Sequence, residues 1–160
     1  MVDLDRLPKI IFIAGVDGCG KTTLSRWLDE YLLSEGVRTS VVWSRFNNYL
    51  SKPLLALTRF TGHNYRKTID GEKFGFHDFE GLHIYNRVFV LLQAIDVNIA
   101  TYLKIRRPLQ ATDVLVCERG PWDTLVDVMA DTGMEGLGAS PVGRLYTALV
   151  RDNTTVLCIS

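Results

Sequence analysis

Short apolar runs alternate along the chain with longer stretches in which apolar residues recur every three or four positions. The short runs are rich in β-branched residues and predict buried strands over 9–14, 39–43, 113–117 and 154–160. The periodic stretches predict helices over 23–33, 51–60, 79–107, 121–131 and 141–152. Because strands and helices alternate, we expect parallel strands joined by right-handed crossovers. The predicted fold class is therefore α/β, with a parallel sheet flanked by helices in three layers.

The longest predicted helix, over 79–107, depends on a single apolar stripe with helical spacing. That stripe consists of Leu82, Tyr85, Phe89, Leu92, Ile95, Ile99 and Leu103. Pro108 follows and is expected to disrupt the helix, since proline cannot continue the hydrogen-bond ladder.

Glycine and polar residues predict the connections between these elements. Gly36 is expected to end the first helix. The segments 61–78 and 132–140 are predicted to be irregular surface loops. The first of them contains His63 and His77, which have no companions that would complete a metal site.

One connection, between the first strand and the first helix, carries a specific motif. It meets the pattern G-x-x-x-x-G-K-[ST] at every required position. Its residues are Gly15, Val16, Asp17, Gly18, Cys19, Gly20, Lys21 and Thr22. Such a loop directs backbone N–H groups towards a phosphate at the positive end of a helix dipole. We expect Lys21 to reach the β- and γ-phosphates of a nucleotide and Thr22 to bind Mg²⁺. A chance glycine-rich turn is the alternative, and the flanking strand and helix argue against it.

Composition narrows the class of protein. The chain has 160 residues, enough for one domain, of which 47% are hydrophobic and 22% charged. Basic and acidic residues both number 18, so bulk charge does not favour a nucleic acid partner. The three cysteines lack zinc-type spacing and are expected to be reduced thiols. We count no apolar run of membrane-spanning length and no signal peptide, and therefore expect a cytoplasmic protein without a membrane partner.

Residues at the carboxyl ends of the second and third strands are candidate ligand contacts, because open parallel sheets bind ligands at that edge. Arg45 could hold an anion there, and Trp43 or Phe46 could stack on a base. The alternative places the two aromatic residues in the core and Arg45 in solvent. Glu118 suits an Mg²⁺-water contact or a catalytic base, and Arg119 suits a phosphate clamp. A plain strand-end salt bridge is the alternative for this pair.

Asp96 lies on or beside the apolar stripe of the long helix. An unpaired carboxylate would be costly there. It is therefore a candidate ligand contact or a partner for an arginine, with a helix-surface position as the alternative.

These residues resemble the thymidylate kinase family of P-loop nucleoside monophosphate kinases. With Thr23, the loop is close to that family's G-x-D-G-x-G-K-[ST]-T, in which Asp17 is the distinguishing residue. The segment 91–119 lies without gaps over the family's pattern from LLFAADR to GDVVICDRY. The resemblance covers nearly the whole chain and implies a single P-loop kinase domain over 1–160 with the three-layer P-loop NTPase fold.

The resemblance implies phosphoryl transfer from ATP, with Mg²⁺, to a nucleoside monophosphate, foremost dTMP to dTDP. It implies that residues 15–23 bind ATP, that Asp17 contacts the acceptor sugar, and that Glu118 lies near the metal with Thr22. The candidate acceptor contacts are Trp43, Arg45, Phe46, Asp96 and Arg119. The candidate catalytic residues are Lys21, Glu118, Arg119 and Asp17.

The chain departs from the family's pattern at three places. Val97 stands where the family has an arginine that helps to read thymine, and Gly120 where it has a tyrosine. The family continues past the fourth strand into a lid with arginines, a helix and a fifth strand. We therefore expect the domain to be C-terminally incomplete at Ser160, with a catalytic arginine supplied by that lid.

Two other functions stay open. A deoxynucleoside kinase also carries Glu-Arg after the third strand, as Glu118 and Arg119 do here. A nucleotide-binding ATPase without a small acceptor is the third hypothesis, although we find no N-K-x-D guanine motif. A homodimer is compatible with all three.

Overall fold

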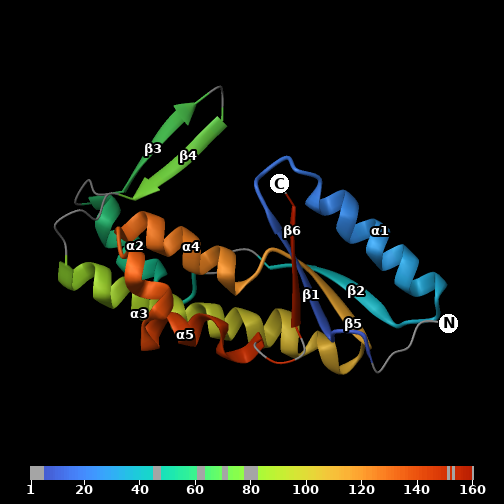
Figure 1. Cartoon of the computed structure of the whole chain (residues 1–160). Coiled ribbons are helices and arrows are strands. Elements are labelled where there is room, and N and C mark those ends of the chain that lie inside the picture. Colours follow the sequence, from blue (N-terminus) through green and yellow to red (C-terminus); the bar gives the residue numbers. More distant parts are fainter. Residues whose placement is uncertain are drawn as a thin grey trace.

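A parallel sheet forms the centre of the protein, in a computed structural model that describes residues 6–44, 48–60, 64–69, 72–77, 83–150, 152 and 154–159. Its four strands are arranged in the order β2-β5-β1-β6 (Figure 1). Their bounds are Ile10–Gly15 for β1, Thr39–Trp43 for β2, Val114–Glu118 for β5 and Thr154–Ile159 for β6. Each neighbouring pair is parallel, as the alternation of strands and helices predicts.

Successive side chains of the central strands β1 and β5 point to opposite faces of the sheet. One face shares a cluster with α1 (Lys21–Ser34), formed by Ile11, Ile13, Leu32, Val37, Val114 and Val116. The other face has a cluster formed by Ile10, Phe12, Ile105, Leu115, Cys117 and Val150. Both faces of these strands are buried, which is why their sequences are continuous apolar runs. The predicted three-layer α/β fold is confirmed.

The remaining helices gather on the face of the sheet opposite α1 (Figure 1). They are α2 (Lys52–Phe60), α3 (His83–Thr101), α4 (Pro121–Thr132) and α5 (Pro141–Thr147), with 3₁₀ turns at Pro108–Gln110, Glu135–Ala139 and Ala148–Val150. A second core holds them together, formed by Leu55, Phe89, Val90, Ala94, Val97, Leu125, Val128, Leu137 and Tyr146.

The first helix ends where Gly36 predicts. Gly36 has a φ of +82°, and its N–H donates to the Leu33 carbonyl oxygen at 3.0 Å. The next N–H, that of Val37, donates to the Leu32 carbonyl oxygen at 3.0 Å. These two bonds form a Schellman cap, and the chain turns from it into β2.

The segment 61–78 was predicted to be an irregular loop, and this prediction is wrong. It contains an antiparallel hairpin of β3 (Asn64–Ile69) and β4 (Glu72–His77). The sequence between the strands is Asp-Gly, a dipeptide strongly associated with two-residue hairpin turns. This dipeptide and His63 lie outside the described residues.

The buried face of α3 differs from the predicted apolar stripe. Phe89 is buried, but Ile95 and Leu103 are 40% and 43% exposed, and Leu82 lies outside the described residues. The buried face instead includes four polar residues, which are Asn86, Gln93, Asp96 and Thr101. Hydrogen-bond partners from the segment before α2 account for two of them, as described below.

The long helix continues beyond α3 as a π-helical turn over Tyr102–Arg106, in which the Arg107 N–H donates to the Tyr102 carbonyl oxygen at 2.9 Å. Pro108 then ends it, as predicted. Within the described residues, Ile84–Gln110 is the one helical stretch long and apolar enough to cross a membrane, although we counted no run of that length in the sequence. Half of the most apolar part of this stretch is buried inside the protein, and the core helices of other proteins are buried in the same way.

Candidate functional site

The loop between β1 and α1 has the backbone that its glycines predict. Gly15 has a φ of +153°, and a Cβ added there would lie 2.3 Å from the Ile159 carbonyl oxygen. Gly20 caps α1 with a φ of +91° and accepts the first helical hydrogen bond, from the Leu24 N–H at 3.0 Å. Glycine is favoured at both positions, by close approach at the first and by left-handed backbone at both. The loop therefore places backbone N–H groups at the positive end of α1.

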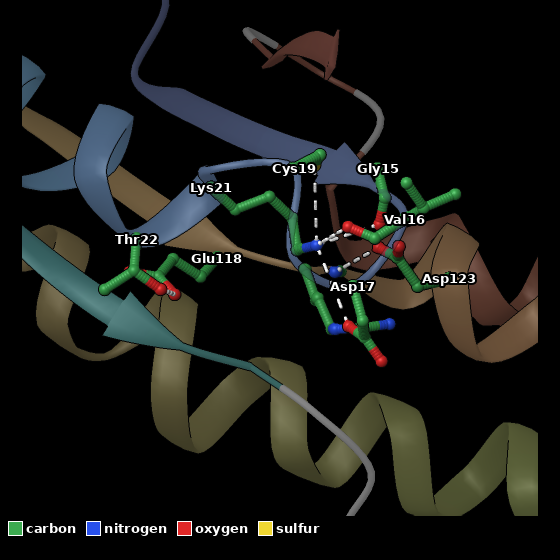
Figure 2. A network of polar contacts seen from close by, with 10 residues as sticks. Gly15, Val16, Asp17, Cys19, Lys21, Thr22, Glu118 and Asp123 are labelled. Atoms are coloured by element: carbon green, nitrogen blue, oxygen red, sulfur yellow. Dashed lines mark hydrogen bonds and ion pairs between the residues drawn. The ribbon is translucent and has the colours of Figure 1, made fainter. Parts of the chain in front are cut away.

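Lys21 folds back over this loop (Figure 2). Its ammonium donates to the carbonyl oxygens of Gly15, at 3.0 Å, and Val16, and lies 3.7 Å from Cys19 Sγ. The side chain is 10% exposed, and its one anionic neighbour among the described residues is Asp17, at 3.8 Å. Because Asp17 is exposed and the other partners are neutral, an incoming phosphate oxygen could replace these contacts.

Glu118 is joined to the start of α1 by two hydroxyl groups. The Thr22 hydroxyl donates to Glu118 Oε2 at 2.9 Å, and the Ser25 hydroxyl lies 2.5 Å from Oε1 (Figure 2 shows the Thr22 contact). Glu118 and Ser25 are both buried. The neighbouring thiol of Cys117 is uncharged at neutral pH, because burial raises its pKa to about 12. Thr22 and Glu118, each predicted to lie near a metal, thus lie side by side at one edge of the sheet, and their binding of a metal stays a prediction.

The contact of Ser25 with Glu118 was not predicted from the sequence, although the position of Ser25 indicates it. It lies three residues after Thr22, and residues at this spacing share one face of a helix. With no exposure to solvent, its hydroxyl needs a partner, and Glu118 supplies it.

Arg119, which follows β5, forms an ion pair with Asp17 of the loop between β1 and α1. It has a φ of +64°, the one positive value found among the described non-glycine residues. A non-glycine residue in this region is strained, and such strain is concentrated at functional sites. The ion pair joins the loop after β5 to the loop between β1 and α1. A salt bridge at the strand end was the alternative to a ligand contact for Arg119, and this ion pair is such a salt bridge. Asp17 is shared between this guanidinium and the Lys21 ammonium.

The next residue, Gly120, explains one departure from the thymidylate kinase pattern. A Cβ at this position would lie 2.5 Å from Phe12 Cδ1. The Phe12 ring is buried and packs edge-on against Trp122, with ring centroids 5.1 Å apart. The tyrosine that the family has here would therefore displace the Phe12 ring.

Trp43 ends β2 at the same edge of the sheet. It is 57% exposed, so the alternative that places it in the core is wrong. The Lys104 ammonium lies 5.9 Å from the centre of its ring. Arg45 and Phe46, the other candidates on this connection, lie outside the described residues.

A hollow of about 330 Å³ lies between the loop after β1 and the carboxyl ends of β2 and β5. Its described lining consists of Asp17, Gly18, Gly20, Lys21, Thr22, Trp43, Glu118 and Arg119. The hollow brings together the cations of Lys21 and Arg119 and the exposed ring of Trp43. Thr22 and Glu118 add side-chain oxygens that can bind a metal ion. Phosphate and a divalent cation are the chemical groups that such a set can hold.

Asp96 is fully buried, so the helix-surface alternative is wrong. Its Oδ2 accepts from the N–H groups of Tyr49 and Ser51 at 3.0 and 2.9 Å and from the Ser51 hydroxyl at 2.6 Å. Its Oδ1 accepts from the Leu50 N–H at 2.7 Å. Gln93, one turn earlier, donates to Asn48 Oδ1 at 2.7 Å. Both side chains thus anchor the segment between β2 and α2, and within the described residues no ion pair joins Asp96 to an arginine, one of the two roles predicted for it. Contact of Asp96 with an acceptor stays a prediction.

Comparison with known proteins finds similarity among solved structures. No protein-family model and no curated protein matches this chain. Among solved structures, it is similar to thymidylate kinase from Ehrlichia chaffeensis, with a TM-score of 0.51, 20% sequence identity, and coverage of 94% of this chain and 76% of that one. A second match is molybdopterin-guanine biosynthesis protein B, with a TM-score of 0.30, 20% identity, and coverage of 70% and 61%. The first match shows that the chain shares the fold of a P-loop kinase.

Proposed function

We propose that this chain binds Mg-ATP at the loop between β1 and α1 and transfers the γ-phosphoryl group to a nucleoside monophosphate, with dTMP as the leading acceptor. The observation that carries the proposal is the convergence of Lys21, the Thr22–Glu118 pair and the Arg119–Asp17 pair on one hollow. The shared fold with a thymidylate kinase supports the choice of acceptor.

Lys21 and the loop would bind the nucleotide phosphates. The ammonium contacts carbonyl oxygens and one exposed carboxylate, all of which it can exchange for phosphate oxygens. Backbone N–H groups of the loop and the dipole of α1 would add to the attraction. Removing the ammonium should therefore weaken both nucleotide binding and stabilisation of the transferred group.

Thr22 and Glu118 fit a magnesium ion. Hydroxyl and carboxylate oxygens are the donors that Mg²⁺ prefers, and these two lie 2.9 Å apart on adjacent elements. When bound, the ion would offset the negative charge of the β- and γ-phosphates. Ser25 would keep the Glu118 carboxylate in place, since its hydroxyl lies at the other oxygen.

Arg119, Asp17 and Trp43 would receive the acceptor. The guanidinium can exchange the Asp17 carboxylate for an acceptor phosphate, which would free Asp17 to accept a hydrogen bond from a sugar hydroxyl. The exposed ring of Trp43 offers a surface on which a base can stack. Arg45 and Phe46 would contribute a second phosphate contact and a second ring.

The reaction is an in-line displacement. An oxygen of the acceptor phosphate forms a bond to the γ-phosphorus while the bond from that phosphorus to the β,γ-bridging oxygen breaks. ADP leaves with the electron pair, and Lys21 and Arg119 offset charge on the transferred group. The protein contributes chiefly position and charge, which is what phosphoryl transfer requires.

A deoxynucleoside kinase is the second candidate, because Glu118 and Arg119 match the Glu-Arg of that family. Its acceptor would be a nucleoside 5′-hydroxyl, which carries no phosphate for Arg119 to bind. The acceptor's own 5′-phosphate therefore separates the two candidates.

The test is ADP formation from Mg-ATP with dTMP, dUMP, thymidine or no acceptor. We expect turnover that depends on dTMP or dUMP. Turnover with thymidine alone would replace the proposal with the nucleoside kinase. ADP formation that no acceptor stimulates would favour an ATPase that transfers the phosphoryl group to water.

A further inference from the structure

A second, larger cleft lies at the opposite end of the sheet from the phosphate loop. It has a volume of about 810 Å³, against about 330 Å³ for the hollow at the loop. Lys9 before β1 and Asp113 before β5 place it at the amino ends of the two central strands. β1 has six residues, so at ~3.3 Å per residue the two sites lie on the order of 20 Å apart. A ligand there would not compete with one at the loop for space.

The polar side of this cleft carries free positive charge. Lys9 and Arg106 both line it and are exposed, and neither forms an ion pair with any residue in the part of the chain that the structure describes. Asp113 also lines it, but the Arg38 guanidinium donates to both of its oxygens, at 3.0 and 2.7 Å. These bonds hold the pKa of the Asp113 carboxyl below its usual range. The carboxylate is therefore paired with an arginine outside the cleft lining, and Lys9 and Arg106 together leave an excess of positive charge facing a ligand.

The apolar side of the cleft can cover a hydrocarbon body. It consists of Leu7, Leu109, Val114, Leu149 and the ring of Tyr102. Val114 has almost no exposed surface, so a ligand would contact chiefly the leucines and Tyr102, which is 56% exposed and open to stacking. The volume of the cleft lies in the range of small-molecule sites, and polar and apolar side chains contribute about equally to its lining.

Tyr102 and Arg106 belong to the π-helical turn after α3. A π turn contains one more residue than an α turn, and such turns occur frequently at functional sites. Here the turn presents an aromatic ring and a guanidinium to the same cleft, four residues apart. The irregular backbone thus coincides with the residues best suited to hold a ligand.

We propose that this cleft is a second ligand site, which takes a small organic anion with one acidic group and an aromatic or other apolar body. The acidic group contacts Lys9 and Arg106, and the body lies between Tyr102 and the leucines. The site does not depend on the proposed kinase activity, because it shares no residue with the hollow at the loop.

Anilinonaphthalene sulfonate is a suitable probe, since it joins a sulfonate to an aromatic body and fluoresces when bound in an apolar site. We expect saturable binding to the full chain that persists with excess Mg-ADP. Lys9→Ala and Arg106→Ala should each weaken binding about threefold, and the double variant about tenfold, as exposed charge pairs allow. Arg107→Ala removes the same charge one residue away, outside the cleft lining, and should leave the affinity unchanged.

A neutral analogue, N-phenylnaphthylamine, tests the anionic part separately. Its affinity should be the same for the wild-type chain and the double variant, with circular dichroism confirming that both are folded. Equal sulfonate affinity in the wild-type chain and the double variant would overturn the proposal. Complete displacement of the probe by Mg-ADP, or an equal loss of the neutral analogue in the double variant, would overturn it as well.

Discussion

Two hydroxyl side chains from α1 meet at the Glu118 carboxylate. Thr22 and Ser25 bind its two oxygens, at 2.9 and 2.5 Å. A buried carboxylate needs such partners, because a buried polar group without hydrogen bonds is costly. The same two hydroxyls fix its direction, which a metal-binding carboxylate also requires. Glu118 is therefore the residue whose substitution tests the site most directly.

Glu118→Gln should raise the Mg²⁺ concentration needed for half-maximal turnover by about 10- to 100-fold, since the amide keeps the shape but loses the charge. The measurement is ADP formation across a magnesium titration. Ser25→Ala is the matched control, because it removes only the supporting hydroxyl and should give a smaller shift. An unchanged magnesium requirement in Glu118→Gln would remove this residue from the metal site.

Asp96→Ala should lower the free energy of unfolding by about 2–4 kcal/mol, because it leaves three backbone N–H groups and a hydroxyl without their buried acceptor. Urea denaturation measures this directly. Glu30→Ala, at an exposed position of α1, should have little effect. Equal stability of the two variants would show that the Asp96 contacts contribute little.

Particular elements show why some of the structure follows from sequence and some does not. β2 has its predicted bounds because its run of β-branched and aromatic residues is flanked by polar ones. The hairpin of β3 and β4 was missed because polar composition outweighed the Asp-Gly signal between the strands. The buried face of α3 was assigned from apolar residues alone, whereas Gln93 and Asp96 are buried by partners more than 40 positions away. Local pattern predicts an element, but distant partners decide which polar residues it buries.

The same distinction holds for the candidate site. The loop of residues 15–22 was predictable because the motif and its flanking elements are contiguous in sequence. Ser25 was not identified, since its role exists only when β5 brings Glu118 beside α1. Gly120 appeared as an unexplained departure from a family pattern until the Phe12 ring was located beside it.

Gly120→Ala tests the contact between the end of β5 and β1. Its Cβ would lie 2.5 Å from Phe12 Cδ1, so we expect a loss of about 1–3 kcal/mol in stability from overpacking. Gly136→Ala is the control, because a Cβ there meets nothing within 4 Å. Phe12→Leu combined with Gly120→Ala should recover part of the loss, and strict additivity in thermal or urea unfolding would contradict the steric explanation.

At the scale of the whole molecule, one sheet separates two places of different chemistry. Its carboxyl edge gathers Lys21, Thr22, Glu118 and Arg119 around a hollow, and its amino edge forms the wider cleft with Lys9 and Arg106. The parallel arrangement produces this separation, because all four strands run in the same direction. Ligands at the two edges are therefore expected to bind independently unless the sheet couples them.

Nucleotide binding should stabilise the folded chain as a unit. A non-hydrolysable ATP analogue with Mg²⁺, at about 100 times its Kd, would add ~2.7 kcal/mol and raise the Tm by about 5–10 °C for a chain of this size. Lys21→Ala should show little increase at the same concentration. An equal increase in both proteins would place the nucleotide elsewhere, and differential scanning fluorimetry can decide.

The most direct measurement of the central claim follows the γ-phosphoryl group itself. ATP labelled at the γ-phosphate is incubated with Mg²⁺, dTMP and the full chain, and the labelled products are separated. We predict labelled dTDP with the wild-type chain and none with Lys21→Ala, which should keep the wild-type circular dichroism spectrum. Label recovered only as inorganic phosphate, or labelled dTDP formed equally by Lys21→Ala, would contradict the account.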